Sequence, residues 1–427
     1  MNPEDIADDA TWDDIEAQFG YNFTDLIKEV PPDVQLEARN PKPPKKEALL
    51  KISKKEAKLK KKTSGDLFKF EKVISNVLPS TVEWTPIPPD KFETTLSDYT
   101  MNKGSERYAK LRWPANDPCV GRRSEMDHFL LHYPQASLPI MLKKTNEVLV
   151  SRKKKVLTEG EYFKWIGIWL AMCVVKLPAR FMYWLTPAQC QHSIMTPMDF
   201  GNRYNMTEDR FNDILLHLKF ADKPNRNDKG VDRWQELRPV VDAFNVQKNK
   251  VFSAGPELCG DESFSAYLGK NGAYADDGLP SVTKNPNKPK GVGLEINDTC
   301  CVQTGILTYC ELAEGKEAMS TWKFTDRYPK HAAMNLRMTE FYHDAAQPVV
   351  FNADSKFSSL EASVALSDHG VKFRGMVKTC TKAYPKAAGN AHTFTERGET
   401  YALETTVNGV KHMAVMWGDR KRKVSPP

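Results

Sequence analysis

The sequence predicts an α/β protein: a mixed sheet with helices on its faces, preceded by a helical region and a disordered N-terminal segment. Helical periodicity dominates residues 103–252, and strand patterns replace it after Ala254-Gly255-Pro256. Beyond that point short apolar strands alternate with helical segments. Residues 1–100 are rich in proline and lack sustained periodicity, which is typical of a disordered segment.

Composition allows substantial folded domains and argues against several classes of protein. A chain of 427 residues with 40% hydrophobic residues is long enough for two or three domains. Its net charge of +6 is modest and does not by itself indicate a partner. No two of the eight cysteines are separated by two residues, so the sequence supports neither a structural zinc site nor a disulfide framework. Scattered thiols fit a reducing compartment, the cytosol or the nucleus.

We expect neither secretion nor membrane association. The N-terminus lacks the basic start and apolar stretch of a signal peptide. The longest apolar run, residues 165–175, is too short to span a membrane.

The helical region contains three predicted helices. Thr158 and Glu161 form a Thr-x-x-Glu capping box at the start of a helix that extends to about residue 177. This helix is apolar almost all round, so we expect it to be deeply buried. Thr207 can cap a second helix, and a third covers residues 232–251. The apolar positions of the second helix have helical spacing: Phe211, Ile214, Leu215 and Leu218.

Beyond residue 255 the predicted order is three strands, a helix, a strand, a helix and a strand. The strands cover residues 258–267, 292–302, 305–312, 348–353 and 371–377, and the helices cover 332–342 and 358–367. Residues 349–351 form a continuous apolar run, as expected for a strand buried on both faces. Two further strands are predicted at residues 401–407 and 410–417.

Two aspartates lie in or beside these strands. Asp261 lies in the first strand, and Asp354 directly follows the buried fourth strand. In a ribonuclease-H-like sheet these two strands are neighbours, so the two carboxylates can meet at one edge and hold Mg²⁺. The alternative is that Asp354 caps the following helix and Asp261 is a surface residue. Spacing alone favours the alternative, because aspartates at strand ends are common.

Several segments between residues 126 and 424 occur together in the order in which one known family has them. They are Glu161-Tyr162-Phe163-Lys164-Trp165; Met206-Thr207-Glu208-Asp209-Arg210-Phe211; Asp261-Glu262; the lysine and glycine loop from Lys284 to Gly293; Asp354-Ser355-Lys356-Phe357-Ser358-Ser359; and a strand at residues 370–378 that leads to Tyr384-Pro385-Lys386. On these segments the chain resembles the piggyBac family of cut-and-paste DNA transposases.

The resemblance implies a metal-dependent transposase with a ribonuclease-H-like core. Asp261 and Asp354 would then be the catalytic residues and the ligands of Mg²⁺ or Mn²⁺. The expected partner is double-stranded DNA, at transposon ends and TTAA-type target sites, and a homodimer is left open. The expected location is the nucleus. The candidate phosphate contacts are Lys284, Lys288, Lys290, Lys378, Lys382 and Lys386.

The sequence departs from the family pattern at the third aspartate, which the family places in a Gly-Val-Asp segment well after the second. None of the acids after Asp354 lies in such a segment. We therefore expect a C-terminally truncated core that binds DNA without cutting it. The alternatives to a DNA-cutting transposase are a non-catalytic DNA-binding remnant of such an enzyme and a gene fragment without molecular function. The acids considered are Asp368, Glu396, Glu399, Glu404 and Asp419.

The expected domain organisation has four parts. Residues 1–100 are an acidic, then lysine-rich tail, and residues 101–254 are a helical domain of dimerisation or DNA-binding type. Residues 255–385 are the incomplete ribonuclease-H-like catalytic core. Residues 386–427 begin a β-rich insertion region.

The lysine run between residues 42 and 62 gives a first testable prediction. A basic run of this kind is either a solvated flexible linker or a nuclear signal or nucleic-acid contact, and it has too few apolar residues to pack. Deleting residues 42–62 should therefore abolish nuclear accumulation or weaken DNA binding, with a nearly unchanged melting temperature. Imaging of a fluorescently tagged chain, DNA binding and thermal denaturation measure the three effects. A clear loss of thermal stability would contradict the prediction.

Overall fold

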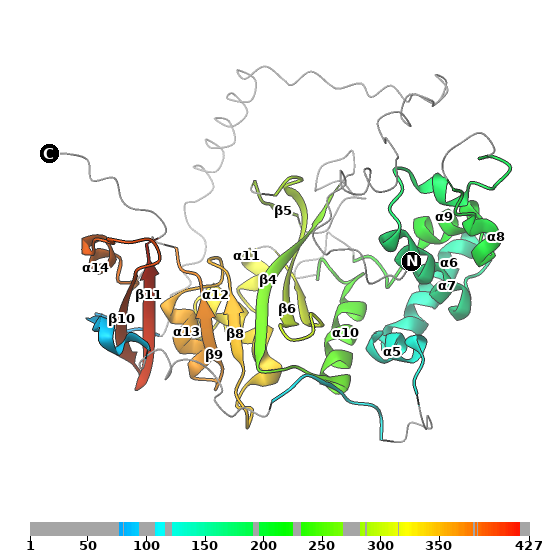
Figure 1. Ribbon diagram of the computed structural model, residues 1–427. Coiled ribbons are helices and arrows are strands. Elements are labelled where there is room, and N and C mark those ends of the chain that lie inside the picture. Colours follow the sequence, from blue (N-terminus) through cyan, green and yellow to red (C-terminus); the bar gives the residue numbers. More distant parts are fainter. Residues whose placement is uncertain are drawn as a thin grey trace, which may run out of the picture. The chain divides into compact units, whose positions relative to one another are not determined.

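The computed structural model describes residues 77–79, 81–93, 107–115, 122–190, 196–224, 232–267, 282–286, 288–314, 316–378, 381 and 383–418 (Figure 1). The chain divides into two units, Met1–Glu71 and Lys72–Pro427, and every described residue lies in the second. The lysine run at residues 42–62, Lys382 and Asp419 lie outside the described residues. Within the described ranges, no helix combines the length and the apolar character needed to cross a membrane.

A group of helices precedes the sheet, with an aromatic core of its own. Trp165 and Trp184 are buried in this core, and their indole N–H groups donate to the backbone oxygens of Phe211 and Met206 at 3.2 and 2.8 Å. The helices are α5 (Glu125–His132), α6 (Leu138–Ser151), α7 (Glu159–Val174), α8 (Phe200–Tyr204) and α9 (Glu208–His217), with the 3₁₀ helices η4 (Gln135–Ser137) and η5 (Arg180–Trp184).

The predicted helix starts at Thr158 and Thr207 are confirmed, and an ion pair joins the two helices. Each threonine side chain accepts a backbone N–H three residues later, from Glu161 and from Arg210, at 3.2 Å. The Glu161 carboxylate also accepts two hydrogen bonds from the Arg210 guanidinium, at 2.6 and 2.8 Å. This pair fixes the start of α7 against the first turn of α9.

The predicted deep burial of α7 is wrong. Its residues Tyr162, Trp165, Ile168 and Met172 are buried, but Leu170 is 53% exposed and Val174 is 84% exposed. Only one side of α7 packs into the aromatic core, although the helix is apolar almost all round. An apolar pattern of this kind therefore did not indicate burial on every side.

Helix α10 (Arg238–Val251) begins later than predicted, because Pro239 lies in its first turn. Asp232, the predicted start, accepts the N–H of Trp234 at 2.9 Å and pairs with Arg238. Further along α10, the Asn245 side chain donates to the backbone oxygen of Cys310 and accepts its N–H, both at 2.9 Å. Asn245 thus satisfies backbone groups on strand β7 (Leu307–Leu312) that would otherwise lie unpaired.

The main sheet is mixed, as predicted. Its strands are β4 (Glu257–Ala266), β5 (Thr283–Lys284), β6 (Val292–Cys301), β7, β8 (Val350–Ala353) and β9 (Lys372–Gly375). The order is β5-β6-β4-β8-β9, with β7 also paired to β6. The pairs among β4, β5, β6 and β7 are antiparallel, whereas β4 with β8 and β8 with β9 are parallel. The first and fourth predicted strands, β4 and β8, are therefore neighbours.

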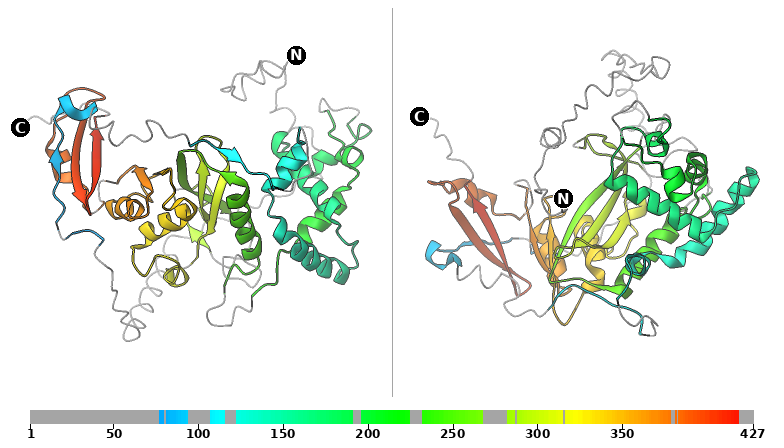
Figure 2. Two further views of the ribbon diagram at one scale, coloured as in Figure 1. Left: turned by 90° about the horizontal axis from the view of Figure 1, so that it is seen from below. Right: turned by 45° about the vertical axis from the view of Figure 1, so that its right-hand side comes forward.

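Helices α12 (Lys330–Thr339) and α13 (Leu360–Ser367) pack against the sheet (Figure 2). All side chains from Ala332 to Thr339 are buried. The Thr299 hydroxyl of β6 donates to the backbone oxygen of Met338 at 3.1 Å, which joins α12 to the middle of the sheet. The short helices α11 (Lys316–Met319) and η6 (Glu340–Tyr342) precede and follow α12.

Two smaller sheets complete the described structure. The two further predicted strands form and pair as a hairpin: β10 (Thr400–Val407) and β11 (Val410–Trp417), after the short helix α14 (Lys386–Ala391). Strand β1 (Thr85–Pro86), from the segment expected to be disordered, pairs with β10, and η3 (Pro89–Lys91) follows it. The other sheet is β2 (Lys110–Leu111) with β3 (Phe252–Ser253).

Gly260 is required where β4, β8 and α12 meet. A Cβ atom on Gly260 would lie 2.2 Å from Cζ of the fully buried Phe351 and 3.1 Å from Cε of Met338. The Gly260→Ala variant should therefore lose about 1–3 kcal/mol of unfolding free energy, as overpacked cores do. Gly167 of α7 has open space around its Cβ position, so Gly167→Ala should stabilise the chain by about 1 kcal/mol. Urea denaturation compares the two, and a neutral Gly260→Ala would contradict the close packing.

A buried ion pair joins α12 to β7. The Arg337 guanidinium donates to the Glu311 carboxylate at 2.6 and 3.1 Å, and the side chains are 7% and 5% exposed. Arg337→Leu should lower the unfolding free energy by about 3–5 kcal/mol, because it leaves the Glu311 charge buried without a cationic partner. Replacing both residues with leucine should recover most of that loss. Chemical denaturation tests the pair, and equal losses in the single and double variants would refute this explanation.

Candidate metal centre

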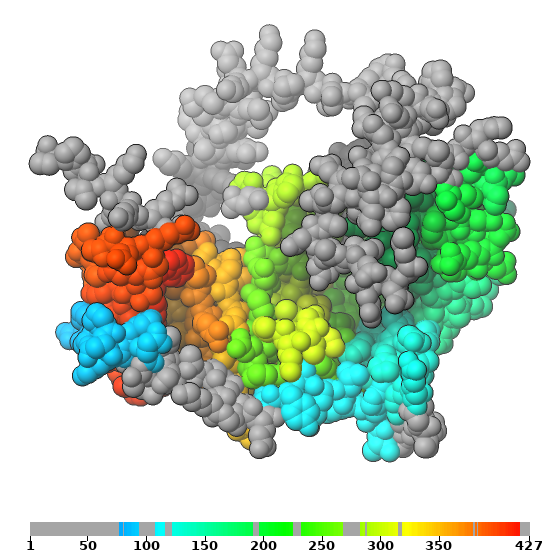
Figure 3. Space-filling model, viewed as in Figure 1, coloured from blue at the N-terminus to red at the C-terminus, as the bar shows by residue number. Residues whose placement is uncertain are grey.

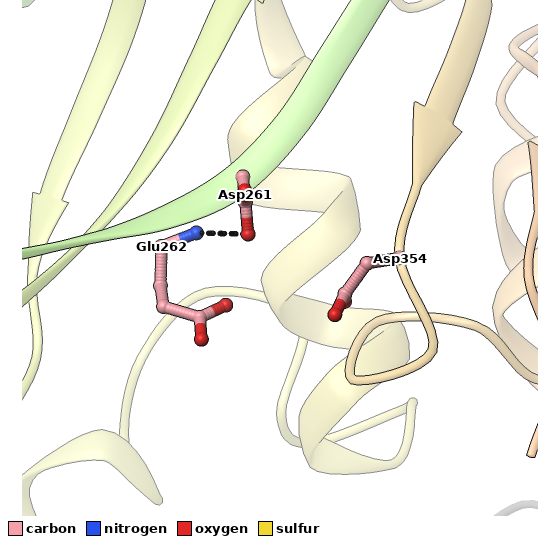
Figure 4. A group of neighbouring side chains, drawn as sticks. All are labelled: Asp261, Glu262 and Asp354. Carbon is pink, nitrogen blue, oxygen red and sulfur yellow. Dashed lines mark hydrogen bonds between the residues drawn. The ribbon is translucent and has the colours of Figure 1, made fainter. Parts of the chain in front are cut away.

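The parallel pairing of β4 with β8 brings the two candidate aspartates together. Gly260 is in register with Ala353, and the next residues along the two strands are Asp261 and Asp354. Together with Glu262, each of these acids offers an oxygen within 4.8 Å of the other two. Figure 4 shows the three carboxylates directed into the same space between β4 and the turn after β8. Their spacing suits shared metal ions that are about 4 Å apart.

Asp354 does not cap the following helix, so that alternative is wrong. Ser359 is the N-cap of α13, and its hydroxyl accepts the N–H of Ala362 at 3.1 Å. The Asp354 carboxylate accepts the N–H of Lys356 at 2.7 Å, and the Ser358 hydroxyl donates to the Asp354 backbone oxygen at 2.7 Å. These bonds tighten the turn after β8 and direct the exposed Asp354 carboxylate towards Asp261.

Asp261 is exposed on β4, as the surface alternative expected, but it also belongs to the acidic cluster. One of its oxygens accepts the N–H of Glu262 at 2.8 Å. Directly across the sheet lies Asp298 of β6, a half-buried acid. Burial raises the pKa of Asp298, a hydrogen bond with Ser263 opposes that change, and the charge of Asp261 adds to it.

Glu262 is the member of the cluster that the sequence did not assign. Its side chain is 11% exposed, and its Oε2 atom is buried without a hydrogen-bond partner. Burial raises its pKa, and the charge of Asp261 adds to this, whereas the ammonium groups of Lys356 and Lys288 oppose it. Those two nitrogens lie 3.7 and 3.8 Å from the Glu262 carboxylate. Side chains of consecutive residues in a strand face opposite sides of the sheet. The strand pattern therefore predicted that Glu262 points away from Asp261 and gave no reason to place both in one site.

These three residues fit a hard divalent cation. They offer carboxylate oxygens, the ligands that such ions prefer. The buried Oε2 of Glu262 has no hydrogen bond, so a cation would supply its missing partner. Among the residues that the structure describes, this is the one group of three His, Cys, Asp or Glu side chains close enough to hold a metal ion.

Of the acids considered as a third ligand, those that the structure describes lie outside the acidic cluster. Glu399 accepts N–H groups of Thr395 and Glu396 and a contact from His392, and the backbone bond from Thr395 contributes most to lowering its pKa to about 2. Glu404 lies 3.9 Å from the Lys411 ammonium on the β10–β11 hairpin. Asp368 and Glu396 do not join the acidic cluster either.

The candidate phosphate contacts differ in their position relative to the cluster. Lys288 contacts Glu262 directly, whereas Lys284, Lys290, Lys378 and Lys386 are exposed and Lys382 is not described. The segment containing β5 and the start of β6 lies on the surface in the view of Figure 3 (yellow-green). Lys356, which the sequence did not assign as a contact, lies closer to the acids than these exposed lysines.

Comparison with known proteins identifies the family to which the chain belongs. A sequence profile of the family described as Transposase IS4 matches residues 125–425. This match covers well over half of the chain, and the chain therefore belongs to that family.

The similarity to piggyBac-type proteins that the sequence indicated is confirmed. The chain is 25% identical over 160 residues to the human "PiggyBac transposable element-derived protein 3" and, equally, to the human "Chimeric ERCC6-PGBD3 protein". These matches cover 37% of this chain but only 26% and 14% of the two relatives.

A solved structure shows the same fold. The cryo-EM structure of a piggyBac transposase synaptic complex with hairpin DNA superposes with a TM-score of 0.52 at 16% identity. The similarity covers 75% of this chain and 65% of that chain. The predicted mixed α/β fold of the piggyBac type is thus confirmed.

Proposed function

We propose that this chain is the core of a piggyBac-type transposase that cuts and rejoins DNA phosphodiester bonds with a divalent metal. The observation that carries the proposal is the meeting of Asp261, Glu262 and Asp354 at the ends of two adjacent parallel strands. Family membership supports it, because it gives this acidic cluster a chemistry that a chance grouping of surface acids would lack.

Mg²⁺ or Mn²⁺ is the proposed metal. Asp261, Glu262 and Asp354 would hold it, and when bound it supplies Lewis acidity that activates an attacking oxygen and stabilises the leaving oxygen of the phosphodiester. The turn of Asp354 and the hydrogen bond from the Glu262 N–H to Asp261 orient two of these carboxylates before any ligand arrives. The lysines beside Glu262 favour its ionised form, which is the form that binds metal.

The proposed substrate is double-stranded DNA at transposon ends and TTAA-type sites. Lys284, Lys290, Lys378 and Lys386 are exposed, and together with Lys382 they are proposed to contact phosphates. Such contacts release counterions, so binding should weaken steeply as salt rises. The solved relative contains hairpin DNA, which supports DNA as the partner class.

Self-association and nuclear location are proposals of the same kind. The exposed Leu170 and Val174 of α7 would favour contact with a second copy of the chain, because burying them removes apolar surface from water. Action on chromosomal DNA would require the nucleus, and the lysine run at residues 42–62 is the proposed signal.

DNA binding without strand cleavage is the second candidate function. One observation favours it: in the described part of the chain, no acid after Asp354 joins the cluster. The family pattern, which has its third aspartate there, led to the expectation of an inactive chain. Glu262 now provides a different third carboxylate, so a cleavage assay separates the two functions.

We expect the unaltered chain to nick a TTAA-containing duplex in Mn²⁺ or Mg²⁺. Asp261→Ala and Asp354→Ala should each lower the rate by more than about a hundredfold, because misplacing a reacting group by 1 Å already has an effect of that size. Both variants should still bind the duplex. The matched control is Asp326→Ala, which removes an exposed aspartate outside the cluster and should cleave normally. Normal DNA binding without metal-dependent nicking by the unaltered chain would instead support the non-catalytic function.

A further inference from the structure

An open hollow of about 580 Å³ lies at the start of α5, and two consecutive arginines line it. The lining residues are Arg122, Arg123, Glu125 and His128, none of which belongs to the acidic cluster or to the candidate phosphate contacts. A guanidinium group carries N–H donors in a planar fork that matches two oxygens of a phosphate. Two such groups in one hollow therefore favour an anionic ligand.

Arg122 is the side chain of this hollow that can take a ligand directly. It is exposed, and in the described part of the chain no hydrogen bond or ion pair holds its guanidinium. Its N–H donors are therefore available to an anion that enters from solvent. Binding would replace the water on these donors with charge-assisted hydrogen bonds.

The Arg123 guanidinium is held in place by an aromatic platform. Its central carbon lies 3.7 Å from the centroid of the Trp113 ring, where the electron-rich face attracts a cation. The His128 ring meets the same indole edge to face, with centroids 5.3 Å apart. Trp113 itself packs against the main hydrophobic core. Arg123 is thus oriented before a ligand arrives, which lowers the entropy cost of binding.

The acids near the hollow leave an excess of positive charge. Glu125 is the one acid in its lining, against two arginines. Asp127 lies one turn into α5, and its carboxylate accepts the backbone N–H and the hydroxyl of Ser124, both at 2.8 Å. These two bonds and the return bond from Ser124 form the capping box of α5. The Asp127 carboxylate is therefore engaged at the helix start, and the hollow retains a net attraction for anions.

The role of Trp113 favours the backbone of a duplex over unpaired bases. Proteins that bind single strands offer aromatic rings on which bases stack. Trp113 instead gives its ring to Arg123 and to the hydrophobic core. A duplex keeps its bases paired and carries one negative charge per about 1.7 Å of its axis. Its phosphates are therefore the groups that fit this hollow.

We propose that the hollow binds the phosphate backbone of double-stranded DNA, with Arg122 as a direct contact and Arg123 as a second contact positioned by Trp113. This assigns a phosphate-binding site to the start of α5, separate from the lysines proposed above. The inference rests on the proposed function for its ligand, because it takes duplex DNA to be the partner of the chain.

The test measures binding of the full chain to two fluorescent duplexes, one containing TTAA and one with a scrambled sequence. Anisotropy is recorded in EDTA at several NaCl concentrations. R122Q should bind both duplexes several-fold more weakly, and equally so, because a phosphate contact carries no sequence information. The slope of log affinity against log salt concentration should become shallower by about 1 for R122Q and by about 2 for R122Q/R123Q.

Three further variants protect the test against folding defects. E125Q removes the opposing acid of the hollow and should bind both duplexes more tightly, which misfolding would not produce. R122K keeps the charge but loses the planar fork, so it should keep the salt slope with a smaller loss of affinity. The matched control is R180Q, which removes an exposed arginine outside the hollow and should leave affinity and slope unchanged.

The outcomes separate this site from the proposed function. If the unaltered chain binds neither duplex, with or without Mn²⁺, DNA is not its partner and both proposals fail. If it binds both duplexes and R122Q, R122Q/R123Q and E125Q all match it in affinity and salt slope, only the site at α5 is overturned. A loss confined to a single-stranded oligonucleotide of the same sequence would also overturn the assignment to duplex backbone.

Discussion

The candidate metal centre depends on the close parallel pairing of β4 with β8, and this pairing depends on a missing side chain. Gly260 has no Cβ atom, and the ring of Phe351 and the end of Met338 occupy the space that one would fill. Strands β4 and β8 and the covering helix α12 therefore meet at one point. That point immediately precedes Asp261 on β4 and Asp354 after β8. Any substitution that separates these strands would also separate the two carboxylates, so stability and chemistry are coupled here.

Bringing acids together has an electrostatic cost, which the surrounding residues offset. Three carboxylates with oxygens within 4.8 Å of one another repel in the absence of a cation. Lys288 and Lys356 place positive charge beside Glu262, the most buried of the three. Both lysines come from segments that follow β4 in the chain, the loop before β6 and the turn after β8. The fold thus brings positive charge from two separate segments to β4, the strand that carries Asp261 and Glu262.

The sequence predicted the parts of the structure that local patterns determine. Thr158 and Thr207 begin helices, and the apolar run before Asp354 forms a buried strand beside β4. It did not predict features that depend on tertiary contacts. Strand alternation placed Glu262 away from Asp261, and β1 is too short to show a periodic pattern. The apolar surface of α7 predicted burial, whereas Val174 is 84% exposed. The catalytic and metal-binding roles of Asp261 and Asp354 stay predictions.

The protonation of the neighbouring acids determines how much negative charge the cluster presents to a cation. Asp298 lies opposite Asp261, and its raised pKa, caused mainly by burial, favours the neutral form. Burial thus disfavours a second negative charge beside Asp261. Glu262 is also buried, but it has two ammonium groups within 4 Å that favour its ionised form. Two half-buried acids on adjacent strands therefore differ in their surroundings, because only Glu262 has lysine side chains beside it.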